Sequence, residues 1–437
     1  MLSQAAYDAP NPSPIGSSDL LYRKVAWRIM PILFVGYIIA YIDRVNVGFA
    51  KLQMMGDLGF SDSVYGFGAG IFFLGYILLE IPSNLILHRV GARGWICRVL
   101  VTWGIVSACT ALVRSPGEFY AIRFLLGIAE AGFFPGMILY LTYWFPSHRR
   151  GKMVAVLLAG SAVSGMIGGP ISGYILRFFT GSRHLAGWQW LFILEAIPAI
   201  ILGVVVLFCL KDRVTDARWL STEEKTVIVA EIGEEAAAKT HNTILSVFTS
   251  PRVWLMGTIY FGIEMGSYAV GFWQPTIIRQ TGVMNVFDIG LLTAVPYTLA
   301  LISMLLVARH ADKKRERRWH VVVPCMVAAL GFALCAQAGS STMVAMIGLI
   351  LAVVGVVTAI PMFWALPTSF LGGAAAAAGI ALVNCTGNIG GFLSPAILGS
   401  LKDHTHTLNS GLLLISGCML GSAILIVALV PARLVNR

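Results

Sequence analysis

Two adjacent residues of opposite charge, Asp43 and Arg44, lie inside the stretch GYIIAYIDRVNVGFA, whose other residues are mostly apolar. A second base and acid, Arg123 and Glu130, occur in RFLLGIAE within another apolar run. Their spacing of seven residues places Arg123 and Glu130 on one face of a helix, about two turns apart. Neighbouring residues of a helix point about 100° apart, so Asp43 and Arg44 need partners on other helices. Two crossed pairs are possible, Asp43 with Arg123 and Glu130 with Arg44.

Such a group of charges could bind an anion and carry a proton. An arginine can hold a carboxylate through two parallel hydrogen bonds, and acids within membrane spans often carry protons in transporters. We therefore predict that Arg44 binds a substrate carboxylate, and that Asp43, Glu130 and Arg123 couple its movement to protons. The alternative is an ion-pair network that only neutralises buried charge.

The chain is far more apolar than a soluble protein. Apolar residues make up 57% of its 437 residues, charged residues make up 12%, and the mean hydropathy is +0.80, whereas soluble domains carry about 25% charged residues. One helical crossing of a bilayer needs about 20 apolar residues, and continuous runs of this length differ from the short alternating strands of a β-barrel. We predict an all-α integral membrane protein with twelve spanning helices, at residues 25–49, 64–87, 95–113, 119–145, 153–178, 188–210, 253–278, 288–308, 320–338, 343–370, 375–400 and 410–431.

The net charge of +10 is distributed as in a membrane protein rather than a nucleic-acid-binding protein. Basic clusters lie between predicted spans, in RVGARGWICR, HRRGK and RHADKKRERR. Cytoplasmic loops of membrane proteins are enriched in Lys and Arg, and such clusters contact anionic lipid headgroups. We therefore expect the lipid bilayer, and no nucleic acid, as the partner of this charge, with both termini on the cytoplasmic side.

A polar segment divides the chain into two similar parts. Residues 211–250 contain STEEKTVIVAEIGEEAAAKT, after the sixth predicted span. HRVGARGW at 88–95 resembles DKKRERRW at 312–319, and GMIGGP at 165–170 resembles GNIGGF at 387–392. Parallel repeats of this kind occur in secondary transporters. We predict a cytoplasmic tail at 1–24, a six-helix bundle at 25–210, a cytoplasmic loop at 211–250 and a second, pseudo-symmetric six-helix bundle at 251–432.

Four stretches of sequence carry a resemblance to a known family: YIDRVNVGFA, YGFGAGIFFLGYILLEIPSNLIL, RFLLGIAEAGFFPGMILYLTYWFP and GWQWLFILEAIPA. Together they resemble the anion:cation symporter family of the major facilitator superfamily, particularly its bacterial tartrate, phthalate and sugar-acid permeases. The resemblance covers nearly the whole chain. It implies the major facilitator fold and the proton-coupled uptake, by alternating access, of an organic anion such as a dicarboxylate, a sugar acid or an aromatic carboxylate.

The same resemblance implies a multi-pass protein of the inner membrane of a bacterium, and we expect it to be a monomer. We expect no cofactor beyond the coupling proton, although sodium coupling stays open. The seven cysteines are scattered within predicted spans without a CxxC pair, so we interpret them as small apolar residues and expect no metal site.

Three residues of the N-terminal bundle are candidates for substrate contact beside Arg44. Tyr41 lies three residues before Arg44 and shares its helix face. Tyr76 is placed at a depth from which its hydroxyl could reach a central cavity. The third is Ser161, where sugar-acid carriers often have Gln, so a contact with a polyol could be shorter or missing here.

The C-terminal bundle offers polar groups without charge. The resemblance to sugar-acid carriers implies that Trp364 and Asn384 line the substrate site. Asn388 lies one turn after Asn384 on the same helix face, and Gln274, before a proline, is a further candidate. We predict that these groups supply neutral hydrogen bonds and aromatic stacking to the substrate.

The repeated loop segments are candidates for gating. In the superfamily an acid usually precedes the arginine of this loop, but here His88 precedes Arg89, whereas Asp312 and Lys313 keep the acid in the second half. The first gate could therefore be weaker or depend on pH. The remaining acids within predicted spans, Glu80, Glu195 and Glu264, are expected to have structural or gating roles.

Other functional classes fit the sequence less well. An enzyme would need a nucleophile with its base or closely spaced metal ligands, but the eight His residues are dispersed. A membrane sensor would be expected to add a soluble signalling domain. The main alternative is a drug:proton antiporter of the same fold, and the arginines Arg44 and Arg123 within predicted spans favour an anionic substrate over a cationic drug.

Overall fold

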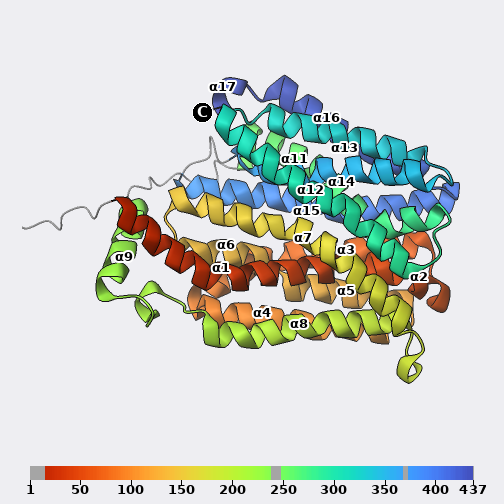
Figure 1. Ribbon diagram of the computed structural model, residues 1–437, viewed down its shortest axis with the longest axis horizontal. Coiled ribbons are helices and arrows are strands. Elements are labelled where there is room, and N and C mark those ends of the chain that lie inside the picture. The colour runs from red at the N-terminus through yellow and green to blue at the C-terminus, as the bar shows by residue number, and fades with distance from the viewer. Residues whose placement is uncertain (1–14, 238–247, 368–372, 437) are drawn as a thin grey trace, which may run out of the picture.

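Long helices that run side by side make up the protein (Figure 1). The computed structural model describes residues 15–237, 248–367 and 373–436. Within these residues every element is an α-helix or a short 3₁₀ turn, and eleven helices are long and apolar enough to cross a membrane. The prediction of an all-α membrane protein is confirmed.

The N-terminal half contains two spans that are each built from two helices. Three short 3₁₀ turns, Thr110–Leu112, Ser182–His184 and Val214–Asp216, follow its long helices. The helices of this half are α1 (Ile15–Val45), α2 (Val47–Leu58), α3 (Asp62–Val90), α4 (Ala92–Cys109), α5 (Pro116–Glu130), α6 (Phe133–Thr142), α7 (Ser147–Phe178) and α8 (Gly187–Cys209).

Helix α9 (Thr222–Ala237) lies in the segment between the halves and packs on the start of α1. Lys24 Nζ lies 2.8 Å from Glu224 Oε2, and the Tyr22 hydroxyl donates a 2.9 Å hydrogen bond to Glu231. The start of α1, helix α9 and the C-terminal turn lie at the same end of the bundle (Figure 1). This agrees with an even number of crossings; the side of the membrane stays a prediction.

The C-terminal half repeats the arrangement with uninterrupted helices. The span predicted at 343–370 ends earlier, at Trp364, and residues 368–372 lie outside the described part of the chain. The helices are α11 (Pro251–Gln280), α12 (Val286–Lys314), α13 (Trp319–Ala336), α14 (Thr342–Trp364), α15 (Gly373–Thr405), α16 (Asn409–Leu429) and the short α17 (Ala432–Val435).

Helix α11 corresponds to the span predicted at 253–278 and is not among the eleven helices that are apolar enough by composition. It is long enough to cross a bilayer, with 30 residues. Almost every side chain from Val253 to Ile278 is buried, including those of Glu264, Ser267 and Gln274. Because neighbouring helices and not lipid surround α11, its polar residues can find protein partners.

Two of the spans in the N-terminal half are interrupted, whereas the sequence analysis predicts continuous helices. Asn46 separates α1 from α2, and a short turn containing Gly132 separates α5 from α6. Gly132 has a φ angle of +82°, which favours glycine, and a methyl group there would overlap the Ser83 side chain of α3. The breaks come within two residues of Arg44 and Glu130, so both charged residues lie at helix ends.

The two halves meet along two helix pairs, α7 with α12 and α3 with α15. Glycines allow the backbones to approach closely. A methyl group on Gly169 of α7 would lie 2.7 Å from the carbonyl oxygen of Gly290 on α12 and 3.1 Å from the Cβ of Thr293. Methyl groups on Gly66 of α3 or Gly399 of α15 would overlap the backbone of the other helix.

Polar contacts join the halves at the end of the bundle where α3 begins and α15 ends. The Asp62 carboxylate lies 2.6 Å from Lys51 Nζ and 3.0 Å from Lys402 Nζ. The backbone N–H groups of Asp62 and Ser63 donate to the Asp403 carboxylate, at 3.0 and 2.8 Å. These residues, which we call the Asp62 cluster, hold this end of the seam closed.

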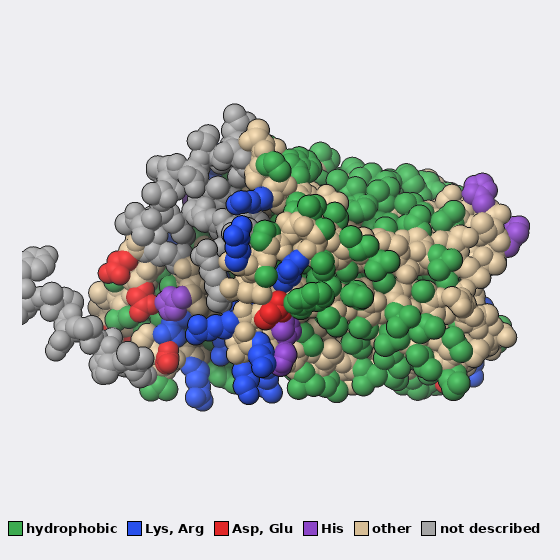
Figure 2. Space-filling view, turned by 90° about the horizontal axis from the view of Figure 1, so that it is seen from above, with side chains coloured by type: hydrophobic (Ala, Val, Ile, Leu, Met, Phe, Trp, Pro, Cys, Tyr) green, Lys and Arg blue, Asp and Glu red, His purple; other side chains and the backbone are tan. Residues whose placement is uncertain are grey.

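The surface agrees with an integral membrane protein. Apolar side chains cover much of the right-hand part of the face shown in Figure 2, and Lys and Arg gather toward the other end. Large apolar side chains such as Leu78 and Phe208 are 61% and 75% exposed. Their exposure is expected for residues that face lipid chains.

A substitution of Gly169 tests the packing of the seam. Gly169→Ala is expected to lower stability by about 1 to 3 kcal/mol, because the added methyl group forces α7 away from α12. Gly417→Ala is the matched control, since no atom lies within 4 Å of the added methyl group, and it should be neutral or slightly stabilising. Thermal unfolding in detergent, followed with a dye that reacts with the buried thiols of Cys325 and Cys335, measures both. Equal midpoints for the two variants would contradict the role of Gly169.

Candidate substrate and proton site

Arg44 and Glu130 form an ion pair where α1 and α5 end. The Glu130 side chain is 1% exposed and the Arg44 side chain 15% exposed, so the pair can be approached only from the arginine. Arg44 Nη1 also donates a 3.3 Å hydrogen bond to the hydroxyl of Tyr268, on α11 of the other half. Its Nε has no hydrogen-bond partner among the residues that the structure describes. The pairing of Arg44 with Glu130 is therefore found as the sequence suggested.

Aromatic rings surround the guanidinium group of Arg44. Its Cζ lies 5.4 Å from the ring centroids of both Phe72 and Tyr76 on α3, a distance at which a cation is attracted to the face of a ring. Arg123 Cζ lies 5.3 Å from the centroid of the same Phe72 ring. Of the predicted substrate contacts, Tyr76 therefore lies against Arg44, while Tyr41 lies close to Ser267 of α11.

Asp43 and Arg123 do not pair, which corrects the other of the two possible pairs. The indole N–H of Trp103 on α4 donates a 2.6 Å hydrogen bond to Asp43 Oδ2, and Oδ1 has no hydrogen-bond partner in the described part of the chain. Arg123 instead donates long bonds to backbone carbonyls: 3.4 Å to Gly68 and 3.5 Å to Ala69 and Arg44. Because neighbouring residues of a helix point about 100° apart, Asp43 points toward α4 and not in the direction of Arg44. The end of α1 leaves the carbonyl of Arg44 free to accept a bond from Arg123.

Glu80 joins the halves near the same site. Its carboxylate is buried, at 4% exposure, and accepts hydrogen bonds from three residues of α15. The amides of Asn384 and Asn388 donate at 2.7 and 3.5 Å, and the thiol of Cys385 donates at 3.7 Å. The structure thus brings the two predicted asparagines together, but around an acid of the protein itself.

Trp364 belongs to an aromatic wall on the C-terminal side. Its ring meets the Tyr260 ring edge to face, with centroids 4.9 Å apart, and Tyr260 stacks on Phe363 at the same distance. Tyr260 lies close to Glu264. This wall could stack against an apolar or aromatic part of a substrate.

Two predicted contacts use their polar groups elsewhere. The Ser161 hydroxyl donates to the carbonyl of Leu158 in its own helix, at 2.8 Å. The Gln274 amide donates to the carbonyl of Thr293, at 3.3 Å. Gln274 also lines a narrow cavity of about 20 Å³ between the halves, which has room for about one water molecule. Neither residue bonds to Arg44 or Glu80, and their part in binding stays a prediction.

The predicted gating residues lie on the surface. His88 and Arg89 are exposed, and the His88 ring lies 6.4 Å from that of Tyr143. Asp312, in the last turn of α12, pairs at 3.4 Å with Arg317 in the loop that follows, and Lys313 is exposed. A role in gating is not tested by these contacts.

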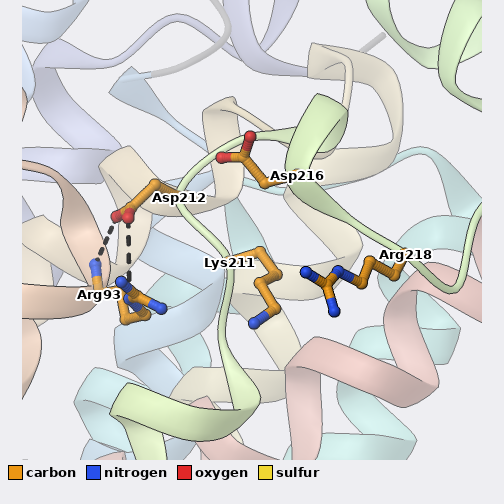
Figure 3. A pocket seen from close by; sticks show the side chains of 5 residues that line it. All are labelled: Arg93, Lys211, Asp212, Asp216 and Arg218. Carbon is orange, nitrogen blue, oxygen red and sulfur yellow. Dashed lines mark hydrogen bonds and ion pairs between the residues drawn. The ribbon is translucent and has the colours of Figure 1, made fainter.

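A charged surface pocket of about 410 Å³ lies near the start of α4 (Figure 3). Asp212 accepts a 2.8 Å hydrogen bond from the backbone of Arg93 and lies 3.8 Å from its guanidinium group. Asp216 adds a second acid to Lys211 and Arg218. Because acids balance most of its positive charge, this pocket is a poor anion site, and its contacts fasten the end of α8 to α4.

Several site residues were not predicted from the sequence. Trp103, Tyr268 and Phe72 are aromatic residues in apolar helices, where aromatic side chains are common and mark no special partner. Glu80 was seen as an acid in a span, but its three donors come from a helix about 300 residues away. Only the fold brings these groups together.

Comparison with known proteins agrees with the fold. The model of the Major Facilitator Superfamily matches residues 33–395. The chain is similar to the "Putative metabolite transport protein NicT" of Pseudomonas putida, with 46% identity over 95% of this chain and 96% of that protein. It is 49% identical to a "Putative tartrate transporter" of Agrobacterium vitis, over 92% and 90% of the two chains. A "Quinolone resistance transporter" of Acinetobacter baumannii is 38% identical over 92% and 93%.

A solved structure shows the same fold at low sequence identity. The crystal structure of a D-xylose-proton symporter superposes with a TM-score of 0.74 and 18% identity, over 93% of this chain and 98% of that chain. The eleven apolar helices together with the largely buried α11 make twelve spanning helices in two halves, which fits this fold. The family model covers most of the chain, and the relatives match it over nearly their whole length. The chain is therefore a multi-pass membrane transporter that belongs to the Major Facilitator Superfamily.

Proposed function

We propose that this transporter takes up an organic anion together with protons across the inner membrane of a bacterium. The observation that carries the proposal is the ion pair of Arg44 and Glu130, which is open only on the side of the arginine. A substrate carboxylate arriving there meets the guanidinium group first. It can replace Glu130 or Tyr268 as the partner of Arg44 through the planar pair of N–H groups.

The balance of buried charge supports coupling to a cation. Among the described residues, five acids near the centre of the bundle are at most 7% exposed: Asp43, Glu80, Glu130, Glu195 and Glu264. The bases that face them are Arg44 and Arg123, because Lys51 pairs with Asp62 at one end. Adding an anion to this surplus of acids is costly in an apolar bundle. Protons bound to the acids would remove that cost, which favours proton-coupled uptake.

The relatives support a carboxylate as the substrate. Two proteins of Agrobacterium vitis, at 49% and 48% identity, have names that refer to tartrate. A small dicarboxylate has one group for Arg44, while its hydroxyls or second carboxylate could reach the amides of Asn384 and Asn388. We include sugar acids and aromatic carboxylates in the class, because Trp364 and Tyr260 offer a stacking wall. The proposed mechanism requires one copy of the chain and no cofactor.

The positions of the contacts between the halves support alternating access. The Asp62 cluster closes one end of the seam, while the bonds from Arg44 to Tyr268 and from Asn384 to Glu80 cross it at the site. A substrate that changes those two bonds can therefore bias the two halves toward a different arrangement.

Export of a quinolone is the second candidate. It rests on the relative of Acinetobacter baumannii whose name refers to quinolone resistance. The aromatic wall of Tyr260, Phe363 and Trp364 in the present protein would suit a flat drug. The position of Arg44 favours an acidic compound here as well, so the two candidates differ in the direction of transport and in the size of the ligand.

A binding screen followed by a transport assay tests the proposal. Ligands that bind the native state raise the unfolding temperature by mass action. Tartrate, gluconate, phthalate, a neutral sugar and a quinolone should be compared with the purified protein. We expect a carboxylate metabolite to raise the midpoint and to enter proteoliposomes under an inward proton gradient. A rise with the quinolone alone would favour the second candidate.

The first prediction from this proposal concerns Arg44. Arg44→Lys is expected to weaken tartrate binding about tenfold or more, because Lys keeps the charge but loses the planar pair of donors. Calorimetric titration measures the affinity. Arg28→Lys, the same change at an exposed position of α1, serves as the control. Wild-type affinity in Arg44→Lys would exclude Arg44 as the carboxylate-binding residue.

The second prediction concerns Glu130. Glu130→Gln imitates the protonated acid and can still bond to Arg44, so exchange of labelled tartrate across proteoliposomes without a gradient should survive. Uptake driven by a proton gradient should fall close to background, because a carrier that cannot release its proton cannot complete the empty return step. Glu118→Gln, at an exposed position of the same helix, is the control. Full gradient-driven uptake with an unchanged pH profile would move the coupling to Asp43 or to sodium.

A further inference from the structure

Glu80 occupies the donors that the C-terminal half presents to the site. Its two oxygens accept bonds from Asn384, Cys385 and Asn388, and the residue is 4% exposed. Within the described part of the chain, its hydrogen-bond partners are these three neutral donors from one face of α15, and none of them is a cation. The groups that contact this buried carboxylate directly stabilise its charged form through neutral hydrogen bonds.

The other titratable groups near Glu80 do not neutralise it. Arg44 faces it from α1, but its guanidinium group is paired with Glu130 of α5. Tyr76 faces it from its own helix, Cys385 from α15, and Tyr268 of α11 lies beyond Tyr76. Since the tyrosines and the thiol are neutral near pH 7, they add no positive charge.

We propose that Glu80 is a second proton site, linked to the substrate: it takes up a proton from water when the anion binds and releases Asn384 and Asn388 to it. An anion that reaches the two amides must approach the Glu80 carboxylate, and like charges in an apolar site repel strongly. One proton added to an oxygen of Glu80 removes that repulsion. The same proton turns the acid into a donor that can bond to a substrate oxygen.

This step gives Glu80 a role different from that of Glu130. Glu130 is paired with a cation, so its proton is linked to the release of Arg44. Glu80 has only neutral partners from the other half, so its proton is linked to the contact between the halves. The inference rests on the proposed function, because it needs an anionic substrate, and it adds one proton to each anion carried.

Isothermal titration of tartrate into the full-length protein, in two buffers of different ionisation enthalpy at about pH 8, counts the protons taken up on binding. Glu80→Gln should take up about one proton fewer than the wild type, and its tartrate affinity should lose a dependence of about tenfold per pH unit. Glu80→Asp keeps a titratable group and should retain the proton. Glu234→Gln, at an exposed position of α9, should match the wild type.

The outcomes separate this inference from the proposed function. Tartrate binding with the same proton count in wild type and Glu80→Gln overturns the role of Glu80 but leaves the anion site in place. Absence of tartrate binding to the wild type counts against the proposed substrate. Glu80 is then tested without ligand, by infrared titration of the same variants: a carboxyl signal present in the wild type and Glu80→Asp but lost in Glu80→Gln supports it, and identical spectra overturn it.

Discussion

The ion pair between Arg44 and Glu130 is the interaction on which the arrangement of the site depends. A charge in an apolar bundle is costly unless it is paired, and this pair joins the ends of two interrupted helices, α1 and α5. The interruptions also have a local use. They leave backbone carbonyls at helix ends, one of which, at Arg44, holds Arg123. The helix breaks therefore place the ion pair at two helix ends, and a carbonyl at one of these ends binds a second arginine.

The rest of the bundle places this charged centre between its two halves. Glycines let α7 pack on α12 and α3 pack on α15 without large side chains between them, so the seam is close-packed but carries few anchors. The stronger polar contacts are gathered in the Asp62 cluster at one end. A seam of this kind can open at one end while the other end closes, which is what alternating access requires.

The sequence predicted the parts of the structure that depend on short-range periodicity. The spans follow from runs of apolar residues, and Arg44 pairs with Glu130 because helix geometry leaves few other partners for either residue. It did not predict the break at Asn46, since nothing around that residue differs from a continuous helix. Asp43 was assigned a possible partner in Arg123, but its real partner is Trp103, whose position depends on how α4 packs. Periodicity gives no information about contacts between helices that are far apart in the sequence.

Glu80 shows why the acids of this bundle must be considered together rather than one by one. From the sequence it is a single acid in an apolar helix, for which a structural role is the ordinary interpretation. In the fold it lies on the seam and binds three donors of the other half. The bundle centre contains more acids than bases, so the charge state of each acid changes the cost of ionising the others. The anion site that we propose among surplus acids would then be sensitive to protons. Glu80, as an acid that touches the opposite half, is well placed to convert proton binding into movement.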